Sequence, residues 1–285
     1  MRSTADVRPG SSGGGLLGLV AVAAGLWAML VWRPTSEPLR LALDPWPSEE
    51  LLWLAKERGL FAAEGLDVQV VEMQSAADSH IAFERGHVDL MVATCAELVG
   101  PNDRALRAVL ALDASFGADV VLARNGIADV AALKGRRVAY EPGSLAAHHL
   151  LRALESAGLG WNDVTAVPMA LVSSNEAFAK GEFDAVVTYP PWSVELVKAG
   201  GVHPIFDSSR IPNEIVDLVV TDATVLKRIP DLPARLRRVW GKAQLLLSDD
   251  AALAAMAARE RMSASEFHAV LGDGIRLVPA GEQVD

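Results

Sequence analysis

The spacing of hydrophobic residues changes repeatedly between two periods along most of the chain. Short runs with period two, typical of strands, are followed by runs with helical spacing, many of which end at a glycine. This pattern favours an α/β fold in which parallel sheets carry helices on both faces. The expected strands cover residues 39–43, 66–72, 88–93, 105–112, 120–123, 136–142, 164–168, 183–188 and 203–206. The chain then returns through residues 213–220, and the remainder from 223 to about 270 is expected to be helical.

The clearest strand-to-helix junction runs from Arg136 to Gly158. Alternating apolar residues give way to leucines at helical spacing, with Gly143 and Ser144 between the two patterns. A helix start leaves backbone N–H groups unpaired, and here they would lie beside a hydroxyl. The junction is therefore a candidate position for an acidic group of a small ligand. The alternative is that Ser144 only caps the helix and Gly143 only makes the turn.

Unusual residues gather in the loops that follow the predicted strands. These loops read DPWPS, SAADS, TCAE, DASFGAD, EPGS and YPPW. Among their residues are aromatic side chains beside prolines, and carboxylates that stand out in three places: Trp46, Tyr189, Trp192, Asp44, Asp113 and Asp119. Ligands of open α/β sheets bind outside the carboxyl ends of the strands, and rigid aromatic walls suit a preformed cleft. We expect the loops to converge on one cleft, with plain core roles for Trp46 and Trp192 as the alternative.

Charge and cysteine content exclude several classes of protein. The chain has 26 Lys and Arg against 36 Asp and Glu, a net charge of −10, and no basic stripe with interleaved aromatics, which argues against a nucleic-acid partner. The single cysteine, Cys95, excludes an intramolecular disulfide and a cysteine-based metal cluster. Adjacent His148 and His149 would point about 100° apart on a helix and cannot chelate one metal ion. We expect no metal and no cofactor.

A hydrolase would need a nucleophile and a base held together. Ser144 with His148 or His149 is the one tempting pair. Ser144 does not lie in a G-x-S-x-G elbow, and Glu141 lies where an oxyanion donor would be needed. The sequence therefore predicts a protein that is not an enzyme.

The N-terminal part of the chain carries an apolar block. Residues 16–32 hold no charge and end at Arg33-Pro34. Such a helix would be roughly 26 Å long, which is marginal for a bilayer core. The block predicts either a signal peptide or an uncleaved N-terminal anchor helix. We expect residues 1–37 to be signal or anchor with a linker, and the rest to be exported, to the periplasm or the outer face of the cytoplasmic membrane.

The motifs, taken in order, resemble one known family. From about Leu39 to Thr224 the chain is similar to the solute-binding proteins of ABC importers in the nitrate/sulfonate/taurine and thiamine-precursor group (NMT1/SsuA/TauA/THI5-like). The segments that carry the resemblance are LALDPWPSEELLWLAKERGLFAAEGLDVQVV, FERGHVDLMVA, DASFGADVVLA, DVAALKGRRVAYEPGS, AFAKGEFDAVVTYPPW and IVDLVVTD. The resemblance implies a type II periplasmic-binding-protein fold, with a ligand cleft between two α/β lobes. The lobes would be residues 38–124 with 213–285, and residues 125–212.

The resemblance also implies ligand-binding positions. They fall on Trp46, Pro47, Ser79, Asp113, Ser115, Asp119, Gly143, Ser144, Tyr189 and Trp192. After FDAVVT the family usually reads Trp-Glu-Pro, whereas this chain reads Tyr-Pro-Pro-Trp over residues 189–192. The acidic contact expected at that point is therefore missing.

These observations predict a non-catalytic receptor that delivers a small polar solute to the permease and ATPase subunits of an ABC importer. The helix start at Ser144 favours an acidic group, and Asp113 and Asp119 favour an ammonium, a guanidinium or ring donors. Sulfonate- or taurine-like, amino-pyrimidine and amine-bearing solutes all fit. Bare nitrate fits poorly, because like charges desolvated together cost several kcal/mol.

Two other functions were weighed against the receptor. One is a membrane-anchored ligand-sensing domain that reports to a separate signalling protein. The other is the pyrimidine-forming enzyme of the same fold family, which needs an iron-linked cysteine and histidine set that this chain does not show.

Overall fold

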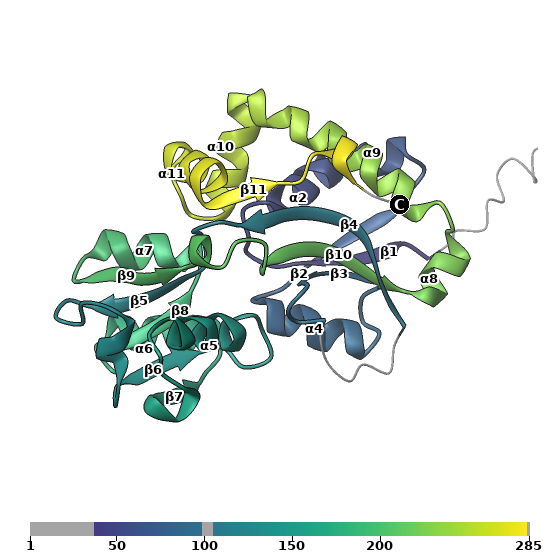
Figure 1. Cartoon of the computed structure of the whole chain (residues 1–285). Helices are drawn as coiled ribbons and strands as arrows, with labels where there is room; N and C mark the ends of the chain where they lie inside the picture. The colour runs from purple at the N-terminus through teal and green to yellow at the C-terminus, as the bar shows by residue number, and fades with distance from the viewer. Residues whose placement is uncertain (1–36, 99–104, 284–285) are drawn as a thin grey trace, which may run out of the picture. The chain divides into compact units, whose positions relative to one another are not determined.

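The computed structural model describes residues 37–98 and 105–283. From Leu39 onward the chain forms one compact unit, whose described strands make two sheets, of six and of five strands (Figure 1). The predicted signal or anchor segment, residues 16–32, lies outside the described residues. None of the described helices has the length and apolarity that crossing a bilayer would require.

The first sheet has the strand order β11-β4-β10-β3-β1-β2. β1 pairs parallel with both β2 and β3, whereas β10 pairs antiparallel with β3 and β4, and β11 antiparallel with β4. The expectation of parallel sheets is therefore wrong for this half of the sheet, because β10 returns from the second sheet and runs against its neighbours. The strands are β1 (Leu39–Leu43), β2 (Val68–Glu72), β3 (Leu90–Thr94), β4 (Leu106–Ser115), β10 (Val216–Asp222) and β11 (Ile275–Leu277).

The second sheet has the strand order β7-β6-β8-β5-β9. It is mixed in the same way: β6 pairs parallel with β7 and β8, and β5 pairs antiparallel with β8 and β9. The strands are β5 (Val120–Arg124), β6 (Arg137–Tyr140), β7 (Thr165–Pro168), β8 (Ala185–Thr188) and β9 (Val202–Asp207).

Helices cover both sheets. The first sheet carries α2 (Glu49–Glu57), α3 (Leu60–Ala63), α4 (Ala76–Glu84), α8 (Ala223–Arg228), α9 (Leu232–Gln244), α10 (Asp250–Arg259) and α11 (Ala264–Ala269). The second carries α5 (Ala146–Ser156), α6 (Leu171–Ala179) and α7 (Trp192–Ala199). Single helical turns are η1 (Val130–Leu133), η2 (Trp161–Asp163), η3 (Ser208–Arg210), η4 (Leu245–Ser248), η5 (Val270–Gly274) and η6 (Ala280–Glu282). We call each sheet with its helices the first and the second sheet unit.

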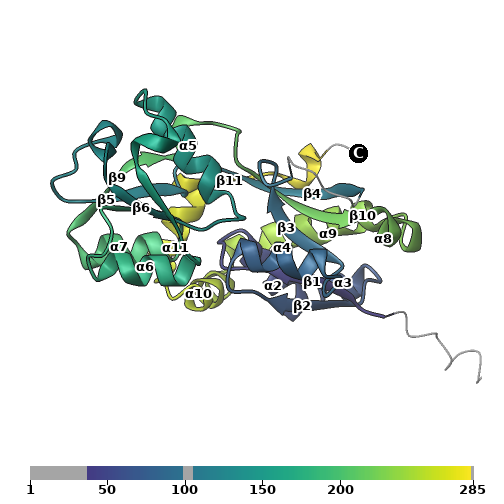
Figure 2. The same ribbon diagram turned by 90° about the horizontal axis from the view of Figure 1, so that it is seen from below.

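Alternating strand residues enter different cores, as expected for a sheet covered on both faces. In β5, Val121 and Ala123 pack in one cluster with Leu150 of α5, whereas Val120 packs in another with Phe178 of α6. Figure 2 shows α5 on one side of this sheet and α6 with α7 on the other. The predicted helix–sheet layering is confirmed.

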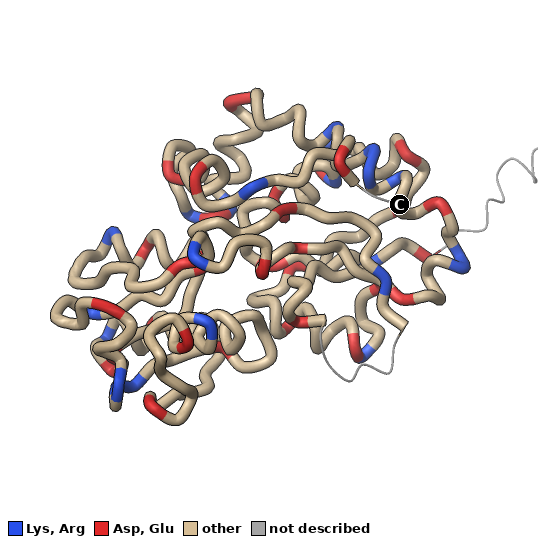
Figure 3. The backbone as a smooth tube through the Cα atoms, in the orientation of Figure 1, with Lys and Arg blue, Asp and Glu red and all other residues tan. Residues whose placement is uncertain are grey.

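The first sheet follows the same rule. Leu41 of β1 lies in a cluster with Leu51 of α2 and Trp240 of α9, and its neighbour Ala42 packs with Phe83 of α4 on the opposite face. The covering helices therefore have apolar faces that the strands bury, and their polar faces remain outside. Acidic and basic residues are interspersed over both sheet units (Figure 3).

Ser48 precedes α2 but does not cap it, because its backbone is helical and its side chain makes no capping hydrogen bond. Its hydroxyl donates instead to Asp113 Oδ2. Side chains do cap other helices: the Ser75 hydroxyl accepts from the Asp78 N–H at the start of α4, and Ser263 with Glu266 forms a capping box on α11.

Two segments connect the sheet units: residues 116–119 between β4 and β5, and residues 208–215 between β9 and β10. They are joined to each other, because the Ser208 hydroxyl accepts from the Gly117 N–H at 2.6 Å and lies 2.7 Å from the Ser115 hydroxyl. The division into lobes at residues 38–124 with 213–285 and 125–212 stays a prediction. Residues 120–124, which the prediction assigns to the first lobe, form β5 and pair in the second sheet.

Candidate functional site

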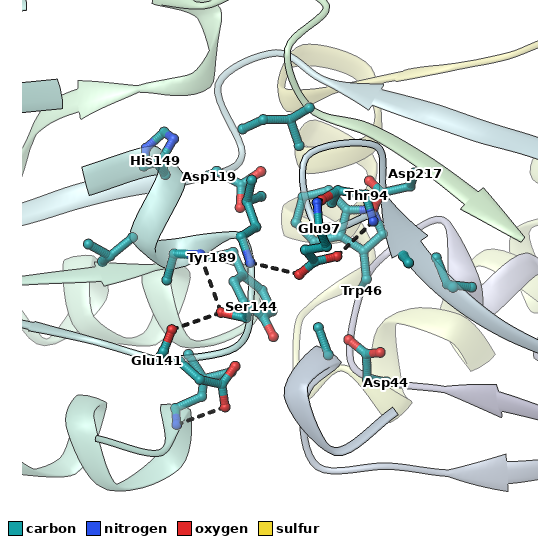
Figure 4. Close-up of a pocket in the computed structure, with 18 of the residues that line it drawn as sticks. Asp44, Trp46, Thr94, Glu97, Asp119, Glu141, Ser144, His149, Tyr189 and Asp217 are labelled. Carbon is teal, nitrogen blue, oxygen red and sulfur yellow. Dashed lines mark hydrogen bonds between the residues drawn. The ribbon is translucent and has the colours of Figure 1, made fainter. Parts of the chain in front are cut away.

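A cavity lies between the two sheet units, where loops leave the strands (Figure 4). The first unit contributes Asp44, Trp46 and Glu97, and the second contributes Glu141, Ser144 and Tyr189. The volume open to the centre of a water-sized sphere is about 50 Å³, and one bound water needs about 10 to 15 Å³ on that measure. In this conformation the cavity has room for a few waters or for a small solute.

Carboxylic acids dominate the polar lining. They are Asp44, Glu49, Glu97, Asp119, Glu141 and Asp217. All of these residues but Glu97 are buried. Glu97 is half-buried as a residue, but its side chain is only 5% exposed. Among the described residues that line the cavity there is no lysine or arginine. The cavity is therefore acidic wherever these groups are ionised.

Asp44 follows β1 directly and lies at one end of the cavity. The Ser79 hydroxyl donates to Asp44 Oδ1 at 2.9 Å, and the Asp44 N–H donates to Glu49 Oε2 at 2.9 Å. Burial raises the pKa of Asp44 to about 7, although the Ser79 hydrogen bond opposes the rise. Burial, together with the charge of Asp44, raises the pKa of Glu49 well above its ordinary value. This end of the cavity therefore carries protons that a positively charged neighbour could displace.

Asp119 lies in the connection from β4 to β5. Its backbone N–H donates to the Ser115 hydroxyl at 3.3 Å, which fixes the turn. The residue is only 5% exposed, and Oδ2 has no hydrogen-bond partner among the described residues. Burial raises the pKa of Asp119 to about 7. A buried, unpaired carboxylate oxygen on a cavity wall is an open acceptor, because such a group is costly unless a donor satisfies it.

Glu97 follows β3 and reaches across the cavity to the second sheet unit. Oε1 accepts from the Leu145 N–H at 2.7 Å, and Oε2 accepts from the Thr94 N–H at 2.7 Å. His80 Nε2 lies 3.4 Å from Oε2. Burial alone would raise the pKa of Glu97, but His80 and the two N–H donors outweigh it and hold the pKa below its usual value. Glu97 is therefore an ionised carboxylate at the start of α5.

Asp113 lies behind the cavity and supports its wall. Oδ2 accepts from Trp46 Nε1 at 3.2 Å and from the Ser48 hydroxyl, so Asp113 orients the indole. Asp113 lies opposite Asp217 in the β4–β10 register. Burial raises the pKa of Asp113 to about 6, and burial with the charge of Asp113 raises the pKa of Asp217 well above its usual value. Burial therefore disfavours the charged form of both carboxyl groups.

Three aromatic rings form a row across the two sheet units. Tyr189 makes edge contacts with Trp46, at 5.7 Å between ring centroids, and with Trp192, at 5.5 Å. Trp46 and Tyr189 line the cavity, whereas Trp192 lines a neighbouring hollow with Pro45 and Trp53. The Tyr189 hydroxyl is buried with no hydrogen-bond partner among the described residues.

The predicted ligand-binding residues separate into three groups. Trp46, Asp119, Ser144 and Tyr189 line the cavity. Ser79, Asp113 and Ser115 are buried and hydrogen-bond to lining residues. Pro47, Gly143 and Trp192 are not in the lining. The loops do converge on a shared hollow, as the sequence predicts, and ligand contact by these residues stays a prediction.

The site also holds titratable residues that are not among the predicted ligand-binding positions, although Asp44 was among the loop residues expected at the cleft. They are Asp44, Glu49, Glu97, Glu141, His149 and Asp217. Asp44, Glu97 and Glu141 lie in the strand-end loops that the sequence had singled out, so a rule that counts every carboxylate in those loops would have found them. Glu49, His149 and Asp217 lie within regular elements, where nothing local distinguishes a cavity-facing side chain from a core one.

The serine–histidine pair weighed as a nucleophile and base is not assembled. Ser144 Oγ donates to the Glu141 carbonyl at 3.1 Å and accepts from the Ala146 N–H. His148 Nε2 lies 3.3 Å from Glu214 Oε2. His149 faces the cavity and packs edge-on against Phe206, and burial lowers its pKa to about 3, which keeps the imidazole neutral. Within the described residues, no group of three or more His, Cys, Asp or Glu could hold a metal ion.

Two mixed α/β sheets facing each other across a cavity are the architecture of periplasmic binding proteins, and solved structures share it. The alkanesulfonate-binding protein SsuA from Xanthomonas axonopodis pv. citri, bound to MOPS, has a TM-score of 0.73 at 21% identity, covering 87% of this chain and 88% of that one. The desulfurization enzyme DSZB also has this fold, with a TM-score of 0.63 at 21% identity and 88% of each chain covered. The predicted fold class is confirmed.

The family follows from the sequence comparison. The family model described as NMT1/THI5 like matches residues 46–247, and the chain belongs to this family. It is also 26% identical, over 166 residues, to a protein of Escherichia coli (strain K12) named "Putative aliphatic sulfonates-binding protein". That match covers 58% of this chain and 48% of the relative, so the chain spans about half the length of the curated relative that it matches. The predicted family is confirmed.

Proposed function

We propose that this protein is the solute-binding receptor of an ABC importer, located in the periplasm or at the outer face of the cytoplasmic membrane. One observation carries the proposal: a buried cavity lined by both sheet units, at the ends of their strands. This is the position where open α/β sheets bind ligands. Membership of the NMT1/THI5-like family and the likeness to a sulfonate-binding protein support the same role.

Contacts across the cavity suggest how the receptor works. Glu97 of the first sheet unit accepts from the Leu145 N–H of the second, and Lys198 pairs with Glu266 at 3.0 Å on the outside. The two connecting segments would act as a hinge between an open and a closed arrangement. A solute that contacts both sheet units binds the closed arrangement better and shifts the population toward it. The closed form would then dock on the permease, with the ATPase driving transport.

We infer that the protein does not catalyse a reaction on its solute. The DSZB likeness means that the fold alone does not decide this point. Two features of the site support the inference: the Ser144 hydroxyl is bonded to the backbone, and His149 is a neutral imidazole without a hydrogen-bond partner among the described residues. A nucleophile held by a base, which acyl transfer requires, is not formed by these groups.

Binding without conversion is the result that tests the receptor role. Purified protein is screened by thermal shift against taurine, alkanesulfonates, amino-pyrimidines, nitrate and small amines, and each hit is titrated calorimetrically. A receptor is expected to bind one class saturably, with a rise in melting temperature that grows with the ligand concentration. The recovered ligand should be chemically unchanged after incubation. Conversion of the ligand, or a protein that carries no small molecule in native mass spectrometry and binds none of the screened classes, contradicts the proposal.

A further inference from the structure

The helix start that the sequence marks for an acidic ligand group already holds a carboxylate of the protein. At the N-terminus of the 11-residue helix α5, the Leu145 N–H donates to Glu97 Oε1 and the Ala146 N–H donates to the Ser144 hydroxyl. Helix N-termini bind anions through such N–H groups and the helix dipole. Glu97 supplies that anion from within the chain, so a sulfonate would have to displace it (Figure 4).

The other polar groups of the lining include carboxylate oxygens that lack hydrogen-bond donors within the described part of the chain. Asp119 Oδ2 is an unpaired acceptor on a residue that is 95% buried, since its exposed fraction is 5%. Glu141 Oε2 is likewise buried without a partner among the described residues, and Asp44 makes one side-chain bond, to Ser79. The described lining contains no lysine or arginine, and the positive neighbour that acts on Asp44 is His80, which pairs with Glu97 and acts to lower the pKa of Asp44. A ligand anion placed among these oxygens would be repelled, and a ligand cation would be attracted.

Two further features narrow the cation to an organic one. No group of three or more described His, Cys, Asp or Glu side chains could hold a metal ion. The cavity also has the rings of Trp46 and Tyr189 on its wall, and aromatic rings bind organic cations through their faces and supply apolar contact. The small volume, about 50 Å³ for the centre of a water-sized sphere, favours a compact molecule.

We propose that the cavity binds a compact organic cation, an ammonium, amidinium or guanidinium group on a small body, whose charge is balanced by Asp119 and Asp44. The inference rests on the proposed receptor function and assigns its solute class. Glu97 would remain on the helix start and keep anions out. The protein would thus differ in specificity from its sulfonate-binding relative while keeping the fold.

A matched series of probes tests the charge preference. Ethylamine, taurine and ethanesulfonate share a two-carbon body and carry a cation, both charges and an anion respectively. We expect millimolar ethylamine and guanidinium to bind the intact protein saturably, and ethanesulfonate not to bind. Asp119→Asn, which keeps the shape of the side chain, is expected to weaken ethylamine binding about tenfold or more, because hydrogen bonds between charged groups are the strong ones. Asp67→Asn, at an exposed aspartate, is the matched control and should leave binding unchanged.

Proton exchange provides a second readout. Buried Asp44 and Asp119 each have a pKa raised by burial to about 7, so they are partly protonated in the empty site at neutral pH. A bound cation lowers their pKa values and releases protons, whereas a bound anion raises them and takes protons up. Calorimetric titrations in two buffers with different ionisation enthalpies give the sign directly. We expect proton release with ethylamine at pH 7, and less of it in Asp119→Asn.

The outcomes separate the inference from the receptor role. Saturable binding of ethanesulfonate, or proton uptake on binding any probe, overturns the cation assignment and leaves the receptor function standing. Binding of neither ethylamine nor guanidinium also overturns the assignment, because an open carboxylate site must accept the smallest cations at millimolar concentration. Equal affinity in wild type and in Asp119→Asn removes Asp119 from the site. The receptor role itself fails only in the broader screen described above.

Discussion

At the scale of single residues, the site depends on acids that folding removes from water. Asp44 and Asp119 have pKa values near 7 because of burial, whereas an aspartate in the unfolded chain titrates near 4. The folded state therefore binds more protons than the unfolded state between these values. The resulting stabilisation is complete below about pH 4 and is lost as the pH rises through about 7.

A stability prediction follows for Asp119. We expect the free energy of unfolding of the ligand-free protein to fall between pH 5 and pH 8, and Asp119→Asn to reduce this fall because an amide does not titrate. At pH 8 the substitution can raise the free energy of unfolding by at most about 4 kcal/mol, because the pKa of Asp119 is shifted by about three pH units and each unit corresponds to 1.36 kcal/mol. Urea unfolding at the two pH values measures it, with Asp67→Asn as the control. Identical slopes in wild type and Asp119→Asn would rule out a raised pKa at this position.

The hydroxyl of Tyr189 gives a different prediction, since it is buried without a partner among the described residues. Tyr189→Phe removes an unsatisfied polar group and keeps the ring contacts with Trp46 and Trp192. We expect the melting temperature to stay the same or to rise slightly, because leaving a buried donor unpaired costs about 1 to 3 kcal/mol. Ligand affinity should fall if this hydroxyl contacts the solute. A melting temperature several degrees lower would mean that the hydroxyl has a structural partner.

At the scale of elements, the start of α5 is where specificity is set. Its N–H groups form an anion site by the geometry of any helix, and a carboxylate from the loop after β3 occupies that site. Glu97 of this loop also pairs with His80 of α4. The pKa of His80 is raised, because the nearby carboxylate outweighs the effect of burial. The carboxylate of Glu97 therefore neutralises the partial positive charge of the α5 N-terminus where it faces the cavity.

Removing the charge of Glu97 should change the preference for ligand charge. In Glu97→Gln we expect ethanesulfonate to bind more tightly relative to ethylamine, because the helix start is no longer balanced by a carboxylate. The variant should also lose about 1 to 2 kcal/mol of stability, as expected when a charge-assisted hydrogen bond becomes a neutral one. Calorimetry with both probes measures the ratio of affinities. Glu57→Gln, at an exposed glutamate of α2, is the control. An unchanged ratio would show that Glu97 does not set the charge preference.

At the scale of the whole molecule, two chain segments connect the sheet units. Residues 116–119 and 208–215 are bound to each other through Ser208, which is fully buried. Opening of the cavity would change the dihedral angles of these few residues while the two cores remain packed. A hinge of this kind fits the proposed mechanism, because separate cores move as rigid bodies.

Ser208→Ala tests the hinge separately from the cavity. The substitution leaves the Gly117 N–H and the Ser115 hydroxyl without this partner, so we expect a loss of about 1 to 3 kcal/mol of stability. Ligand affinity should change much less than in Asp119→Asn, because Ser208 does not line the cavity. Thermal unfolding and titration with ethylamine measure the two effects, and Ser265→Ala, at an exposed serine of α11, is the control. Loss of binding at unchanged stability would place Ser208 in the ligand site.

Much of this protein is readable from local sequence. Strand β1 begins and ends where the apolar run predicts, at Leu39 and Leu43, and α5 ends within two residues of the expected stop at Gly158. Trp46, Asp119, Ser144 and Tyr189 were picked as loop residues and line one cavity. These predictions succeed because side-chain periodicity and strand-end loops are local properties, which any α/β fold arranges in the same way.

Tertiary structure alone decided which charged groups meet at the site. The sequence marks Ser144 as a place for an anion, but only the fold brings Glu97, 47 positions earlier in the chain, within 2.7 Å of the adjacent Leu145 N–H. It also sets Asp217 of β10 opposite Asp113 of β4. Local patterns determined which elements form and which loops meet. The pairing of groups distant in sequence, and the burial that shifts their pKa values, exist only after the two sheet units have packed.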